Sequence, residues 1–177
     1  MLSTSLAAYT WLAPAIIATE LIVGLLLACV LVARPRISWT LAAIAVAAPL
    51  ALTLYPSGRA SDVGCTFDVE LQLLAPEPLA NIALFVPMAL LVAIATGSPL
   101  RGALAGAALS AAIEVVQAVA PIIGRACTAD DWLANSIGAA LGAGVAALAL
   151  LLRSRAARRR GSRPSDRSPV ASTTTRP

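Results

Sequence analysis

The chain has no histidine and no lysine, because all 13 of its basic residues are arginine. Histidine serves as a general base, as a zinc ligand and as the partner of a nucleophilic serine or cysteine, and lysine forms Schiff bases. The two absences exclude these reaction classes. Any acid–base chemistry must rest on carboxylates, and we expect no cofactor and no metal ion.

Charged and aromatic residues are also scarce, at 12% and 4% of the 177 residues, whereas 59% are hydrophobic. An average soluble domain carries roughly 25% charged residues. The chain therefore has too few polar side chains to cover a water-soluble domain, and the composition predicts a membrane protein.

Five stretches are long enough for transmembrane helices, each of which needs about 20 mostly apolar residues. They are called spans one to five and run from Ala7 to Ala33, Ile37 to Tyr55, Leu79 to Thr96, Leu100 to Ala120 and Trp132 to Leu152. Span one exceeds the apolar region of a signal peptide, and no basic residue precedes it, so we expect it to remain as a helix. The expected fold is an all-α membrane protein, a bundle of about five transmembrane helices in one domain, residues 1–152.

The placement of arginine predicts the orientation, because short cytoplasmic loops are enriched in basic residues. Arg34 and Arg36 join spans one and two, Arg101 opens span four, and an arginine-rich tail follows span five. All three segments lie on one side of the bundle. We therefore expect the N-terminus outside and the C-terminus in the cytoplasm.

The net charge of +4 divides unevenly along the chain. Residues 153–177 hold eight arginines and one acid, a net +7, while residues 1–152 hold five arginines and eight acids, a net −3. The tail is rich in Pro, Ser, Thr and Arg, which predicts disorder. Its arginines can attract anionic lipid or act only as a topology signal, and we expect no nucleic-acid partner.

Two of the three cysteines lie in the loops expected outside the cytoplasm, where oxidation is permitted. We predict a disulfide between Cys65 and Cys127 that ties these loops together. Cys29 lies inside span one and is expected to act as a small apolar side chain.

A few polar residues interrupt the apolar spans, where a central charge costs about 2.5 to 3.5 kcal/mol. Glu20 in span one and Glu114 in span four are the carboxylates placed within the hydrocarbon. One face of span four carries Gly102, Gly106, Ser110, Glu114 and Gln117, and one face of span five carries Asp131, Asn135, Gly138 and Gly142. We expect these two faces to pack against each other, because small residues allow helices to approach closely.

The polar residues of these faces lie near the expected outer boundary of the membrane, with Glu114 about 10 Å below the end of its helix. One outer-leaflet pocket is predicted to contain Glu114, Gln117, Arg125, Asp131, Asn135, Asn81 and Asp130. In the alternative interpretation, these groups only satisfy one another as helix packing, and Arg125 pairs with an aspartate.

Short motifs in the second half of the chain resemble the VanZ-like family, bacterial membrane proteins named after a teicoplanin-resistance factor. They are Asn81-x-x-x-Phe85-x-Pro87, Glu114-x-x-Gln117, Gly124-Arg125, Asp131, Asn135, Gly138 and Gly142. The resemblance covers roughly residues 79 to 152 and, more loosely, the whole membrane part. Thr128 stands where the family often has an acidic residue, and Ala89 where it often has glycine.

The resemblance implies a multi-pass protein of the bacterial plasma membrane and cell envelope, with a possible link to lipoglycopeptide resistance and no established reaction. It assigns Glu114 and Gln117 to the family's polar pair on span four. Arg125, Asp131 and Asn135 take the positions of its loop-to-helix set.

Three functions are compatible with the sequence. We favour non-enzymatic binding of an amphiphilic or lipid-linked ligand, such as an envelope precursor or a glycopeptide, with Arg125 holding an anionic head group. The alternative is an intramembrane enzyme that acts on a lipid-linked substrate through Glu114 and Asp131, as acid and base or as Mg²⁺ ligands. Proton-coupled transport through Glu20 and Glu114 is the third, although five spans without an internal repeat need an oligomer for it. Membrane lipids are expected partners, and a homo-oligomer stays open.

Overall fold

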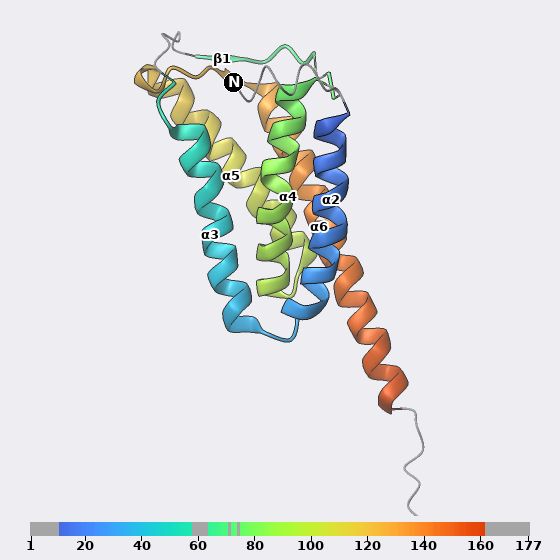
Figure 1. Cartoon of the computed structure of the whole chain (residues 1–177). Helices are drawn as coiled ribbons and strands as arrows, with labels where there is room; N and C mark the ends of the chain where they lie inside the picture. The colour runs from blue at the N-terminus through green and yellow to red at the C-terminus, as the bar shows by residue number, and fades with distance from the viewer. Residues whose placement is uncertain (1–10, 58–63, 71, 74, 162–177) are drawn as a thin grey trace, which may run out of the picture.

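The chain forms a bundle of five long helices, seen in a computed structural model that describes residues 11–57, 64–70, 72–73 and 75–161 (Figure 1). The helices are α2 (Leu12–Leu31), α3 (Pro35–Leu54), α4 (Pro76–Thr96), α5 (Pro99–Val119) and α6 (Ala129–Gly161). Two short strands, β1 (Cys65–Thr66) and β2 (Cys127–Thr128), and a 3₁₀ turn, η1 (Pro121–Ile123), lie in the connections. All five helices are long and apolar enough to cross a membrane, which confirms the predicted all-α membrane fold.

The predicted ends of spans two to four agree with the helices to within a few residues, because proline marks the helix starts. Pro35, Pro76 and Pro99 occupy the first turns of α3, α4 and α5, where a missing N–H costs nothing. Gly97 ends α4 with a positive φ of 65°, a conformation that glycine adopts without strain. The first residues of span one, 7–10, lie outside the described residues.

The boundary placed at Arg153 is corrected, since α6 continues to Gly161. The added residues are mostly arginine and alanine, which are strong helix formers, and extending an existing helix costs far less than nucleating one. Three arginines in the last turn also complement the negative end of the helix dipole. Residues 162–177 of the expected disordered tail lie outside the described residues.

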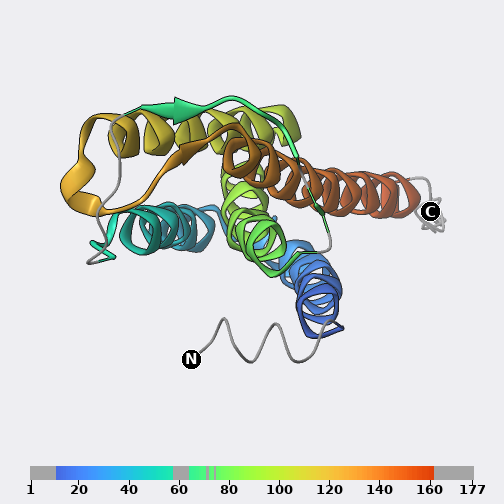
Figure 2. The same ribbon diagram turned by 90° about the horizontal axis from the view of Figure 1, so that it is seen from above.

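Helix α4 is the centre of the bundle. It packs against α2, α3, α5 and α6, whereas α2 and α3 lie on different sides of it and contact each other little (Figure 2). Half of the α4 span is buried, against 17% of the α2 and α3 spans. The large side chains Phe85 and Met88 are fully buried on it. Most of the α2 and α3 surface is therefore left to face lipid.

Glycines bring the central helices into backbone contact. A Cβ added at Gly138 or Gly142 of α6 would meet a backbone carbonyl oxygen of α4, and one added at Gly106 of α5 would meet Ala139 of α6. The expected packing of span four on span five is therefore correct at Gly106. It is wrong for Gly138 and Gly142, which contact span three, because α4, α5 and α6 all pack against one another.

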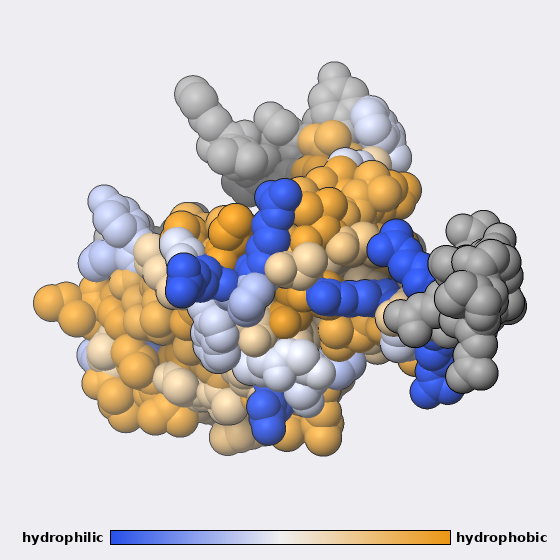
Figure 3. Space-filling model, turned by 90° about the horizontal axis from the view of Figure 1, so that it is seen from below, coloured by the Kyte–Doolittle hydropathy of each residue, from blue (hydrophilic) through white to orange (hydrophobic). Residues whose placement is uncertain are grey.

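The two ends of the bundle carry charges of opposite sign. The arginine end holds eight described arginines, namely Arg34, Arg36, Arg101, Arg153, Arg155, Arg158, Arg159 and Arg160. Figure 3 looks at the bundle from this side, where hydrophilic groups stand out from a mostly hydrophobic surface. The acidic end holds Asp68, Glu70, Glu77, Asp130 and Asp131. The expected orientation in the membrane depends on this separation of charge. The orientation itself stays a prediction.

We predict opposite effects of alanine at two glycines of α6. Gly142→Ala should destabilise the protein by about 1 to 3 kcal/mol, because its Cβ collides with the backbone of α4. Gly144→Ala is the matched control, since nothing lies within 4 Å of the added Cβ, and it should be neutral or stabilising by up to about 1 kcal/mol. Thermal unfolding in detergent measures both, and equal stability of the two variants would contradict the close α4–α6 contact.

Candidate functional site

A disulfide closes the acidic end of the bundle. Cys65 of β1 and Cys127 of β2 are bonded, with their Cα atoms 4.5 Å apart and a sequence separation of 62. The two strands pair in parallel, with Cys65 opposite Cys127 and Thr66 opposite Thr128. The predicted bridge is confirmed, and it ties the α3–α4 connection to the start of α6. Cys29 carries a free thiol.

Thr128 joins Glu114 to the N-terminus of α6. The Thr128 backbone N–H donates to Glu114 Oε2 at 2.9 Å. The Thr128 hydroxyl oxygen accepts from the backbone N–H of Asp131 at 3.1 Å, as an N-cap residue does three positions before its partner. The Glu114 carboxylate thus lies at the positive end of the α6 dipole, where a negative group is stabilising.

Asp131 continues this network to the central helix. Its Oδ1 accepts a hydrogen bond of 2.6 Å from Asn81 Nδ2 near the start of α4. The other aspartate, Asp130, accepts at 3.3 Å from the backbone N–H of Glu70 and so holds the loop that follows β1. The first turn of α6 is therefore bonded to α4, to α5 and to the α3–α4 connection.

A second set of bonds joins α5 and its following loop to the end of α3. Gln117 Nε2 donates to the Thr53 carbonyl at 3.1 Å, and Arg125 Nη2 donates to the Leu52 carbonyl at 3.2 Å. The last carbonyls of a helix have no partner within it, so both side chains cap the C-terminus of α3. In the described part of the chain no ion pair joins Arg125 to Asp130 or Asp131, so the Arg–Asp pair of the alternative interpretation does not form.

Deeper in the bundle, Asn135 Nδ2 donates to Ser110 Oγ at 2.9 Å, and both residues are buried. Glu114 and Gln117 are also buried, with 7% and 5% of their surfaces exposed. Arg125, in contrast, is exposed. The predicted residues therefore differ in burial, with Glu114, Gln117 and Asn135 buried and Arg125 exposed. The other three are half-buried, namely Asn81, Asp130 and Asp131.

Three buried acceptor atoms of the predicted set have no hydrogen-bond donor among the described residues. They are Gln117 Oε1, Asn135 Oδ1 and Asp130 Oδ1. An unsatisfied buried polar atom costs about 1 to 3 kcal/mol, so each of these sites favours a donor such as a water or a hydroxyl group. The described residues contain no group of three or more acidic or cysteine side chains arranged to hold a metal ion.

Two features of the site were not predicted from the sequence, namely the central position of Thr128 and the hydrogen bond between Ser110 and Asn135. The spacing Thr128-x-x-Asp131 directly before an apolar run is close to a capping-box pattern, so it was a usable signal for Thr128. No comparable signal in the sequence marks the carbonyls of Leu52 and Thr53, because backbone acceptors carry no residue identity.

These features define a multi-pass α-helical membrane protein, closed at one end by a disulfide and by a carboxylate bound to a helix N-terminus. The family model VanZ/LLP1 matches residues 21–152, from within α2 to within α6. The chain therefore belongs to the VanZ/LLP1 family, as the motifs around Glu114 and Asp131 indicated. Comparison with curated proteins and with solved structures gave no match.

We predict that the disulfide stabilises the acidic end. The double variant Cys65→Ser/Cys127→Ser should lose about 4 kcal/mol, the chain-entropy value for a closed loop of about this length. Cys29→Ser is the control and should unfold like the wild type. Alkylation of the unreduced protein, followed by mass spectrometry, should modify one thiol, and modification of all three would contradict the bridge.

Proposed function

We propose that this protein is a non-enzymatic component of the bacterial plasma membrane and cell envelope that binds the anionic head group of an amphiphilic or lipid-linked ligand at its acidic end. The observation that carries the proposal is Arg125. It is the one arginine described at that end, its side chain is exposed, and its hydrogen bond is to a neutral carbonyl rather than to a carboxylate. Its charge remains available to an anion.

Exposed apolar side chains at the same end support an amphiphilic ligand. Tyr55 follows α3, Phe67 follows β1 and Ile122 lies in η1, and each is at least 73% exposed. Aromatic residues such as Tyr55 are typical of the membrane–water interface. A head group held at Arg125 would place its lipid part beside this apolar surface.

The segment that carries Arg125 is held rigidly, which favours binding because little ordering is then needed. The Ser57 hydroxyl donates to the Gly124 carbonyl at 2.5 Å, and the Ser57 backbone N–H donates to the Ile123 carbonyl at 2.9 Å. The bond from Arg125 to Leu52 orients the guanidinium itself. The family also supplies the expectation of a link to teicoplanin-type resistance.

The second candidate function is an intramembrane enzyme that uses Glu114 and Asp131. It is favoured by one observation, namely that both residues bond to Thr128 and so lie close together. Both carboxylates, however, already accept hydrogen bonds from protein donors. A role in anchoring α6 accounts for these bonds without any chemistry.

Arg125 and Glu114 variants distinguish the two functions. With undecaprenyl phosphate as the probe, Arg125→Ala should weaken binding by about tenfold or more, the value of a charge-assisted hydrogen bond. Arg125→Lys should retain part of the affinity, and Arg101→Ala, at the opposite end, should retain all of it. Undecaprenol, which lacks the phosphate, should bind equally to all four proteins.

Glu114→Gln keeps an acceptor for the Thr128 amide and should leave probe binding within about threefold of the wild type. An enzyme acting through Glu114 would instead lose product formation, measured by chromatography of lipid extracts. If Arg125→Ala and Glu114→Gln both bind the probe like the wild type, the polar residues are structural and the proposal is wrong.

The proposed site requires the acidic end to face outward, so we predict N-terminus out and C-terminus in. Alkaline phosphatase fused after Pro177 should be inactive, and green fluorescent protein at the same position should fluoresce. A phosphatase fusion after Ser57, in the α3–α4 connection, is the control and should be active. The reverse pattern would place Arg125 in the cytoplasm and contradict the proposal.

A further inference from the structure

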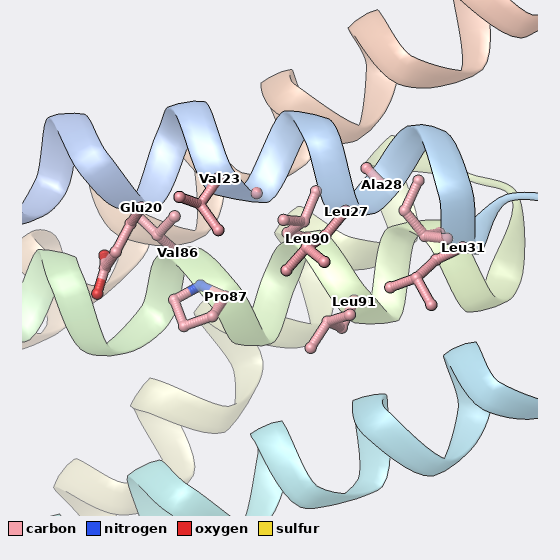
Figure 4. Close-up of a pocket in the computed structure, with 11 residues that line it drawn as sticks. Glu20, Val23, Leu27, Ala28, Leu31, Val86, Pro87, Leu90 and Leu91 are labelled. Atoms are coloured by element: carbon pink, nitrogen blue, oxygen red, sulfur yellow. The ribbon is translucent and has the colours of Figure 1, made fainter.

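A groove runs between α2 and α4 on the lipid-facing side of the bundle (Figure 4). Its volume is about 160 Å³, and its walls are formed by aliphatic side chains of the two helices, including Leu27, Leu31, Leu90 and Ile94. The polar exception is Glu20 at one end, whose Oε2 is buried without a donor among the described residues. The groove exists because α2 and α3 both pack on α4 and contact each other little.

The length of the groove matches one leaflet of a bilayer. From Glu20 to Leu31 the groove follows eleven steps of α2, which is about 16 Å at 1.5 Å per residue. Half of the hydrocarbon core is about 15 Å. A chain entering from the arginine end would meet aliphatic side chains along its whole length, and its first polar neighbour would be Glu20.

The open end of the groove lies beside fixed positive charge. Leu31 ends α2, and Arg34 and Arg36 follow it, both exposed. The buried Ser38 hydroxyl bonds to the carbonyls of Leu31 and Arg34 at 2.9 and 3.1 Å and so holds this turn in place. No acidic residue is described at this end of the bundle, so the arginines have no competing carboxylate partner there.

We propose that the α2–α4 groove binds one acyl chain of an anionic phospholipid whose phosphate lies against Arg34 and Arg36. A second copy of this chain offers no cation near the middle of its described membrane spans to pair with Glu20, because the arginines of these spans lie at the arginine end. The site shares no residue with the one proposed at Arg125, so either can fail alone.

Native mass spectrometry of the full chain in detergent tests this site. The probes are dioleoyl phosphatidylglycerol and dioleoyl phosphatidylcholine, which have the same chains and differ in net charge. The wild type should bind phosphatidylglycerol more tightly than phosphatidylcholine, and Arg34→Gln/Arg36→Gln should reduce this preference by about tenfold or more. Arg101→Gln is the control, because Arg101 is exposed at the same end but belongs to α5, which does not line the groove, and it should leave the preference unchanged.

The groove is tested with a pair of tryptophan substitutions on α2. Leu27 lines the groove and Val30 does not. The two side chains are almost equally exposed, at 54% and 50%, so Val30 is a matched control. Leu27→Trp should fill the groove and reduce binding of both lipids several-fold, and Val30→Trp should bind both like the wild type. Val23→Trp, farther along the same groove, gives a second variant should Leu27→Trp fail to fold.

Three results would overturn the proposal. The first is equal binding of the two lipids by the wild type. The second is identical lipid binding by the Leu27→Trp, Val23→Trp and Val30→Trp variants. The third is a dimer that Leu27→Trp dissociates, which would assign the groove to a second copy of the chain.

Discussion

The hydrogen bond between the Thr128 amide and the Glu114 carboxylate is the interaction on which the acidic end depends. It places a negative group at the N-terminus of α6, where unsatisfied N–H groups and the helix dipole both favour it. From that point bonds extend to Asp131 and Asn81, and the strand that contains Thr128 carries the disulfide to Cys65. A buried carboxylate is costly in a membrane, and here it accepts a hydrogen bond from the Thr128 backbone N–H at the start of α6.

Close packing of helix backbones at glycines holds the rest of the bundle together. Within a membrane the hydrophobic effect does not hold helices together, so contact through small residues takes its place. Gly138 and Gly142 bring α6 against the carbonyls of α4, and Gly102 does the same for α5. The three central helices form a tight unit, while α2 packs against α4 and α6, α3 packs mainly against α4, and α2 and α3 contact each other little. This asymmetry produces the lipid-facing groove.

The two ends of the molecule offer different surfaces for binding. The acidic end combines an exposed Arg125, which donates to the Leu52 carbonyl, with exposed apolar side chains. The opposite end combines Arg34 and Arg36 with the mouth of an aliphatic groove. Both arrangements fit amphiphiles with anionic head groups, and they would meet different leaflets of the bilayer.

The number of spans, their approximate ends, the separation of charge and the cysteine pair could all be predicted from the amino-acid sequence, because they depend on local hydrophobicity and on side-chain chemistry. The sequence also indicated Glu114, Asp131 and Asn135 as polar residues within the membrane part. Three outcomes became clear only from the three-dimensional arrangement of the helices. The α6 glycines contact α4, Arg125 bonds to a carbonyl of α3 rather than to an aspartate, and α6 ends at Gly161. These outcomes depend on backbone carbonyls and helix crossings, which bring together groups that no sequence spacing relates.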